Sequence, residues 1–252
     1  NEATQIVIGG TLRVSSKDNH AKISCAKWEG IITGVSGKVD FDGIDIENAK
    51  AAIKTTADAG DSVIKNSKVL NCTRPFEVGK SSKLTLDHVE ASVPTTTGSF
   101  EKSYVEVFGT LEAHYLKYNA QTSEGLMAED GGTVIVTNAL GLGTVAGGVS
   151  VASGATLNIN GVTVAETPVT LNGTGVGGNG ALTGTGVATV SGASVVLQTS
   201  SSIGVANAAD VLTITGVVSG AGMNLTKVGA GTVILAAAKV GSLICGWTVK
   251  GK

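Results

Sequence analysis

Carboxylate side chains crowd one short segment near the start of the sequence. Asp40, Asp42, Asp45 and Glu47 all lie within eight residues. Carboxylates this close together can supply the oxygen ligands of a calcium ion or exchange protons with a substrate. The alternative is a solvated face whose acids pair with basic neighbours. The positions of the surrounding lysines distinguish the two interpretations.

Other residues with chemical potential are scattered. The three histidines are His20, His88 and His114, and the three cysteines are Cys25, Cys72 and Cys245. They form no Ser/His/Asp or Cys/His set and have no metal-ligand spacing. The odd number of cysteines allows one internal disulfide, and buried structural thiols are an equal alternative. Residues 173–178 fit GxGxxG, but the Gly, Thr and Val residues that follow favour a turn over a nucleotide-binding helix. We therefore expect no cofactor and no metal.

A short phrase of alternating apolar and polar residues returns at a near-constant interval. Its starts are Val39, Ser62, Leu84, Leu111, Val134 and Leu157. A period in the twenties with strand chemistry in each unit is typical of a solenoid. We predict an all-β fold, a single-stranded parallel β-helix with rungs of about 22–27 residues.

Two further predictions follow from this repeat. Residues 45–56 have helical propensity, but their alignment with the next unit of the repeat predicts a strand. Beyond Leu157, the next plausible starts are Leu182, Leu212 and Val233.

The register set by the apolar residues places outward charges in three columns that alternate in sign. These columns are Lys38, Asp61 and Lys83; then Asp42, Lys65, Asp87 and His114; then Asp45, Lys68, Glu90 and Lys117. Opposite charges on neighbouring strands stabilise a sheet by roughly 0.2–1 kcal/mol per pair. Since Asp42 and Asp45 belong to these columns, we interpret the acidic run as structural. The same register places Asn48 against Asn71, which predicts an asparagine stack at a turn.

Two parts of the sequence resemble known families. Alternation followed by Asn and then Ile or Phe, as in Asn48…Ile53 and Asn71…Phe76, resembles right-handed parallel β-helices of the pectate-lyase-like superfamily. Residues 154–182 and 211–235 are similar to the passenger repeats of bacterial autotransporters. The Leu-Thr-Lys-x-Gly-x-Gly-Thr-Leu phrase of those repeats stands here as LTKVGAGTV, beginning at Leu225. The resemblance implies a right-handed solenoid at a bacterial cell surface.

The first of these families includes polysaccharide lyases, which need acidic calcium ligands near an Arg or Lys base. Arg13 and Arg74 are the only arginines, and Arg74, close to Glu77 and Lys80, is the one place that fits. Because acids elsewhere alternate with lysines, we expect the chain not to be an enzyme. A polysaccharide lyase or hydrolase is the third of three functional hypotheses.

Composition divides the chain into two halves of one solenoid. Residues 1–130 carry most of the charge, and residues 131–252 are rich in Gly, Thr and Val with autotransporter-like repeats. The net charge of −2 gives no basic footprint for nucleic acid, and no apolar run is long enough for a transmembrane helix. We interpret the first residues as a mature N-terminus after signal removal, which predicts a secreted protein.

Both ends of the sequence are typical of ordinary strands, with no amphipathic capping helix. Exposed strand edges recruit other chains, so we predict self-association through these ends. The residues expected to carry it are Ile6, Ile8, Leu12, Val14, Leu243, Cys245, Trp247 and Val249. The leading hypothesis is a secreted structural subunit whose copies add head to tail into an extracellular fibre or surface layer. The alternative is a monomeric adhesin whose polar face binds surface glycans.

Overall fold

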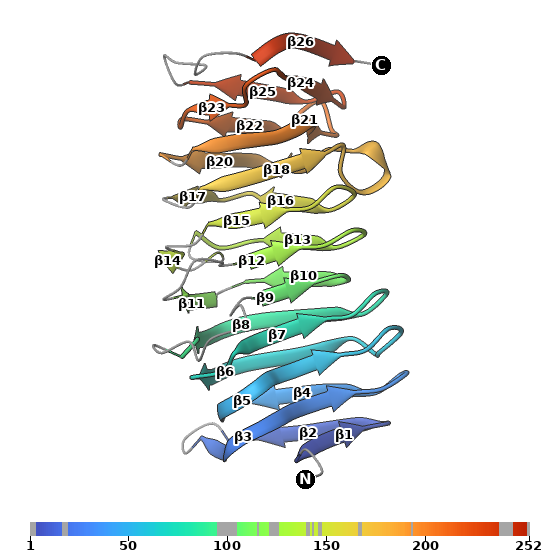
Figure 1. The fold of residues 1–252 in the computed structure, drawn as a ribbon, viewed down its shortest axis with the longest axis vertical. Helices are drawn as coiled ribbons and strands as arrows, with labels where there is room; N and C mark the ends of the chain where they lie inside the picture. The colour runs from blue at the N-terminus through green and yellow to red at the C-terminus, as the bar shows by residue number, and fades with distance from the viewer. Residues whose placement is uncertain are drawn as a thin grey trace.

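Parallel strands stack into a β-solenoid of about 9 turns, as the sequence predicts. The computed structural model describes residues 4–16, 20–94, 105–114, 116–120, 126–139, 142, 144–145, 148–165, 168–192, 194–236 and 244–250. At residues 26–27, 118–120, 144–145 and 244–250 it describes the backbone alone. The first and last strands, β1 and β26, lie at opposite ends of an elongated stack (Figure 1).

Strands fall on three faces, because each turn of the chain contributes three extended segments. Face 1 contains β2 (Thr11–Ser15), β4 (Lys38–Asp42), the starts of β6 (Ser62–Leu70) and β8 (Lys83–Ser92), β10 (Thr110–Ala113), β13 (Thr133–Val136), β16 (Thr156–Asn160), β19 (Leu182–Thr185), the end of β21 (Val195–Val205), β24 (Met223–Val228) and β26 (Ile244–Lys250). Face 2 contains the starts of β3 (Ala21–Thr33) and β5 (Ile44–Thr55), the ends of β6 and β8, β11 (Leu116–Ala120), β14 (Thr144–Val145), β17 (Thr163–Ala165), β20 (Val187–Ser191), β22 (Val211–Ile214) and β25 (Thr232–Leu235). Face 3 contains β1 (Gln5–Ile8), the ends of β3 and β5, β7 (Arg74–Val78), β9 (Val105–Val107), β12 (Leu126–Ala128), β15 (Val149–Val151), β18 (Val169–Gly173), the start of β21 and β23 (Val218–Ser219).

Face 2 is split between two sheets. Its strands up to β14 belong to the long sheet that also carries faces 1 and 3, whereas β17, β20, β22 and β25 form a separate four-stranded parallel sheet. One short 3₁₀ turn, η1 (Val176–Gly178), lies in the loop between β18 and β19. No helix in the described part of the chain is long and apolar enough to cross a membrane.

Inward side chains form continuous apolar columns. On face 1, Phe41, Ile64, Leu86, Ala113 and Val136 occupy successive rungs in register, and each has 0% exposed surface. Burying one such aliphatic side chain stabilises a fold by about 1.5–3 kcal/mol. Because stacked strands lie about 4.8 Å apart, each residue packs on its counterparts above and below. The repeat period is therefore the length of chain needed to bring the next apolar residue onto the same column.

Two serines interrupt the columns and are hydrogen-bonded. Ser62 and Ser67 face inward at 0% and 2% exposure. The Ser62 hydroxyl accepts a hydrogen bond from the Val39 N–H at 3.1 Å, and the Ser67 hydroxyl accepts one from the Ile44 N–H at 3.1 Å. These bonds offset the cost of burying a polar group.

From Val39 to Leu157, the strands pair in the register that the sequence predicts. Ser62 pairs with Leu84, Leu84 with Leu111, Leu111 with Val134, and Val134 with Leu157. The segment with helical propensity is strand β5, also as predicted. The strand pairing crosses the composition boundary near residue 131, since β10 pairs with β13 and β12 with β15.

Beyond Leu157 the predicted starts are only partly right. Leu182 does pair with Leu157, but its next partner is Ile203, followed by Lys227. Leu212 and Val233 pair with each other on face 2 instead. The Leu-Thr-Ile alternation of β22 carries the same signal as a face 1 strand, so sequence alone placed it on the wrong face.

A glycine hides the true start at Ile203. Gly204 interrupts the alternation because the loop after η1 crosses directly over it, and a Cβ there would lie 1.8 Å from the Asn179 carbonyl oxygen. The close approach of backbone requires glycine at this position.

Asparagines stack at the corner between faces 2 and 3. Asn48 and Asn71 have left-handed backbones, with φ of 60° and 55°, which asparagine tolerates better than most residues. The Asn71 amide donates to the Asn48 side-chain oxygen at 2.6 Å, and the Asn48 amide donates to the Ser24 hydroxyl at 3.2 Å. This is the stack that the sequence predicts, extended by one rung.

Truncating the face 1 column tests how far the stack depends on it. We expect Leu86→Ala to lower the free energy of unfolding by about 2–5 kcal/mol, because rungs above and below leave a cavity that they cannot close. Thr85→Ala, one residue away on the outward side, should change it by less than about 0.5 kcal/mol. Urea denaturation followed by circular dichroism measures both. Equal losses in the two variants would contradict a stacked core.

Candidate functional site

The four acids at the start of the chain do not converge. Asp40 and Asp42 lie on β4 of face 1, whereas Asp45 and Glu47 lie on β5 of face 2. Each has its own partner from a neighbouring rung. The contacts are Arg13 Nε to Asp40 at 2.8 Å, Asn66 Nδ2 to Asp42 at 2.8 Å, His20 Nδ1 to Asp45 at 2.5 Å, and Lys22 Nζ to Glu47 at 2.9 Å. Within the described ranges, no group of three or more His, Cys, Asp or Glu residues could hold a metal ion.

The strand register aligns the charge columns, but few of their members pair with one another. Asp45, Lys68, Glu90 and Lys117 lie opposite one another in succession, as do Asp42, Lys65 and Asp87. In the column of Asp45, Lys68, Glu90 and Lys117, the Lys117 ammonium lies 3.1 Å from Glu90.

Other members of the columns have partners outside them. Lys83 bonds Glu112 of the next rung at 2.5 Å, and this hydrogen bond raises the pKa of Lys83. Among the described residues, Lys38, Lys65 and Lys68 have no ion pair within 4.0 Å.

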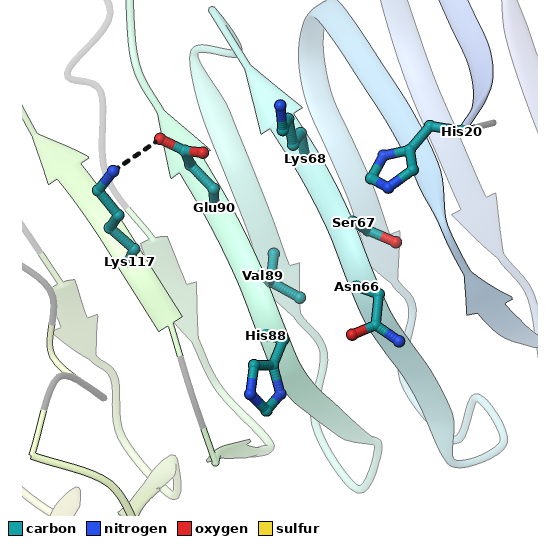
Figure 2. Close-up of a pocket in the computed structure, with 8 residues that line it drawn as sticks. All are labelled: His20, Asn66, Ser67, Lys68, His88, Val89, Glu90 and Lys117. Carbon is teal, nitrogen blue, oxygen red and sulfur yellow. Dashed lines mark hydrogen bonds and ion pairs between the residues drawn. The ribbon is translucent and has the colours of Figure 1, made fainter. Parts of the chain in front are cut away.

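One shallow groove runs over these columns at the corner between faces 1 and 2 (Figure 2). Its volume is about 390 Å³, and it is lined by His20, Asn66, Ser67, Lys68, His88, Val89, Glu90 and Lys117. Figure 2 shows Lys68 and Glu90 side by side on adjacent strands, with Lys117 paired to Glu90 beyond them. The His88 ring lies 2.7 Å from Asp87. The groove is charged with both signs.

A denser ionic cluster lies on face 3. Lys54, Glu77 and Glu106 occupy one outward column of β5, β7 and β9. Lys54 Nζ lies 2.6 Å from Glu77, and Arg74 Nη1 lies 3.4 Å from Glu77 and 3.5 Å from Glu106. The Glu77 and Glu106 side chains are 13% and 12% exposed. Arg74 therefore bridges two neighbouring carboxylates that would otherwise repel each other.

This cluster contains the one place where the sequence suggested enzyme chemistry. The structure brings Arg74 and Glu77 together, and adds Lys54 and Glu106, which sequence reasoning missed. Lys80 lies in the turn after β7 and makes no ion pair within 4.0 Å among the described residues. The sequence could have predicted the Lys54 contact, because Lys54 stands one repeat before Glu77. Glu106 was missed because the chain between Glu77 and Glu106 is longer than the neighbouring rungs, so the repeat period does not align the two residues.

Glu129 extends the acidic side of the cluster. Burial raises the pKa of the Glu129 carboxyl above its ordinary value, and the negative charge of Glu106 raises it further. A carboxylate in this position is less stable than one in water.

A second groove lies on face 1 beneath the loop that contains η1. Its volume is about 410 Å³, and its lining is uncharged: Thr133, Ile135, Thr156, Asn158, Asn160, Val176, Asn179, Thr183 and Thr185. The Asn158 amide donates to the Thr183 and Thr185 hydroxyls at 2.8 and 3.1 Å. The glycines of the GxGxxG segment turn this loop, and strand β19 follows it, so the predicted turn is correct.

The cysteines divide by burial. Cys25 is exposed and Cys72 is buried, and both are free thiols. Burial raises the pKa of the Cys72 thiol to about 11. The backbone at Cys245 belongs to β26, and its side chain is not described.

The predicted self-association residues lie at the two ends of the stack. Ile6, Ile8, Leu12 and Val14 point inward from β1 and β2, where they are only partly buried against the core. Trp247 and Val249 lie opposite Leu225 and Lys227 of β24. Leu243 lies outside the described residues.

No family model, curated protein or solved structure matches the chain.

Glu129 provides a test of the electrostatics on face 3. Because the pKa of its carboxyl is higher in the folded than in the unfolded chain, ionisation of Glu129 opposes folding as the pH rises through that pKa. We expect Glu129→Gln to increase the free energy of unfolding slightly at pH 7, with the gain absent well below pH 4.5, the ordinary pKa. Denaturation at both pH values measures it, with Asp130→Asn in the adjacent turn as the control. A gain of equal size at both would contradict this account.

Thiol reactivity tests the burial of Cys72. At pH 8 a thiol with a pKa of about 11 holds on the order of 0.1% thiolate, so we expect iodoacetamide to label Cys25 and spare Cys72. Peptide mapping by mass spectrometry separates the cysteines, and unfolding in urea should expose all of them. Equal labelling of Cys25 and Cys72 in the folded protein would show that the rung around Cys72 opens.

Proposed function

We propose that this chain is a secreted, non-enzymatic structural subunit whose copies add end to end into an extracellular fibre or surface layer. The observation that supports it is the partial exposure of the inward side chains on β1 and β2. Ile6, Ile8, Leu12 and Val14 point into the core yet stay partly exposed. Their partners in the next rung, among them Ile31 and Val39, are 0% and 1% exposed.

The backbone at this end is equally open. In the described part of the chain, β1 pairs only with β3, and β2 only with β4. Each of these strands therefore has one edge that no other described strand pairs with, and such an edge is a template for another parallel strand. At the other end of the stack, β26 pairs only with β24, and β25 only with β22, among the described strands.

The strand edges at the two ends of the stack can pair with each other. Among the described strands, a second copy placed head to tail would bring its β26 against β2 on face 1 and its β23 against β1 on face 3. This would continue the strand ladder and bury the partly exposed side chains of β1 and β2. A contact between two different surfaces does not close on itself, so repetition produces a filament.

The ion pairs support a structural rather than catalytic role. Arg74, the residue closest to a lyase base, is held between Glu77 and Glu106. The acids near residue 40 are divided between two faces and individually paired. Secretion rests on the similarity to autotransporter passenger repeats at residues 154–182 and 211–235.

The uncharged groove on face 1 supports a second candidate, a monomeric adhesin that binds a surface glycan. Threonine hydroxyls and asparagine amides on three successive rungs offer donors and acceptors to sugar hydroxyls. Binding of the monomer to a neutral glycan on an array, lost in Asn158→Leu, would favour this candidate over the filament.

Charged substitutions at the first rung distinguish end-to-end growth from other association. We expect the wild-type protein to form filaments at high concentration in negative-stain images, and Ile6→Lys to reduce the polymer fraction in size-exclusion chromatography at least tenfold. A lysine that points into the end of the core must be desolvated on stacking.

Val7→Lys is the matched control, since Val7 belongs to the same strand, faces outward and is 62% exposed. This variant should polymerise as the wild type does. A wild-type protein that stays monomeric at high concentration, or equal loss in both variants, would overturn the proposal.

A further inference from the structure

The four-stranded sheet of face 2 presents an uncharged outer surface. Its strands are β17, β20, β22 and β25, stacked along the C-terminal half (Figure 1). One outward row contains Thr163, Thr189, Thr213 and Ile234, in register from strand to strand. We call the outward side of these four strands the Thr/Val face.

The Thr/Val face carries no charge. Residues 163–165, 187–191, 211–215 and 232–236 include no charged and no aromatic side chain. Face 2 earlier in the stack is charged on the successive rungs of β5, β6, β8 and β11, through Asp45, Lys68, Glu90 and Lys117. The same side of the solenoid thus changes from an ionic surface to a neutral β-branched one.

Large apolar side chains are exposed on this face. Val187 is 73% exposed and Ile234 is 44% exposed, whereas aliphatic residues on the inward side of the same strands, such as Leu212 and Ile214, are 0% exposed. Neutral β-branched strands without proline or charge lack the residues that normally prevent sheets from associating. The face therefore favours contact with another surface.

We propose that the Thr/Val face packs against the same face of a second copy of this chain. A charged partner would find no counter-charge here, and a sugar ring would find no aromatic side chain to stack on. A second Thr/Val face has the same strand spacing of about 4.8 Å and desolvates no charge, so the two rows of β-branched side chains can interdigitate in the manner of paired sheets about 10 Å apart.

The size of the face determines when this contact forms. Four strands about 4.8 Å apart and three to five residues long cover roughly 250 Å². A stable interface needs about 800 Å² on each partner. Isolated subunits therefore associate only weakly through this face.

Within a filament the same contact repeats once per subunit, and its contributions accumulate along two aligned fibres. Lateral pairing of filaments rests on the end-to-end assembly proposed above. The weak pairing of isolated subunits does not.

The test adds one charge at the centre of the face. Thr213→Lys places an ammonium in the contact, where a second copy brings another ammonium opposite it. The matched control is Thr85→Lys, an outward position of β8 on face 1. Sedimentation equilibrium near millimolar concentration, with Ile6→Lys present to block growth from the ends, measures the pairing of subunits.

The expected result is weak dimerisation that survives high salt, is retained with Thr85→Lys, and falls at least tenfold with Thr213→Lys. In images of filaments without the Ile6→Lys change, wild-type fibres should be paired and Thr213→Lys fibres single, at equal length. No association near millimolar concentration, or association that Thr213→Lys does not weaken, would overturn the inference. Association lost in Thr213→Lys without any filaments would support this face and refute the end-to-end proposal.

Discussion

Stacking in register is the constraint on which the rest of this structure depends. Every rung between the two ends forms backbone hydrogen bonds with the rung before and the rung after, so an inward residue must lie over a residue of similar kind. The column from Phe41 through Ile64 to Leu86 meets this requirement with fully buried side chains. Where a serine enters a column, as at Ser62, its hydroxyl is satisfied by the neighbouring backbone. Such a fold is stabilised mainly by contacts between residues one rung apart.

The same constraint governs what the outer surface can do. Residues adjacent in sequence point to opposite sides or lie on different faces, whereas residues one rung apart lie side by side. Acids that are close in sequence are consequently separated, as Asp42 and Asp45 are, and each meets a partner from another rung. Conversely, Glu77 and Glu106 lie directly opposite each other, and Arg74 offsets their repulsion. The ionic clusters of the first half thus connect neighbouring rungs.

The outer surface also differs in charge between the two halves of the solenoid, although the stack of strands is continuous. The first half keeps its outer columns hydrated with paired or alternating charges, which oppose association with a neighbouring sheet. The second half replaces them with threonine and valine, and Val187 and Ile234 are left exposed. The partly exposed inward side chains of β1 and β2 and the neutral Thr/Val face are the two surfaces on which the proposed assembly rests.

The sequence by itself determined the architecture wherever its apolar alternation was regular. From Val39 to Leu157 it predicted the strand register, the strand at residues 45–56 and the asparagine stack, because each depends only on what recurs in the next unit of the repeat. It failed after Leu182, because Gly204 breaks the alternation beneath a crossing loop and a face 2 strand, β22, carries an identical pattern. It also missed Glu106 as a neighbour of Glu77, because chain length between those rungs departs from the repeat. The tertiary structure alone decided which face each strand occupies and which charges meet, since both depend on how far each loop carries the chain before the next strand begins.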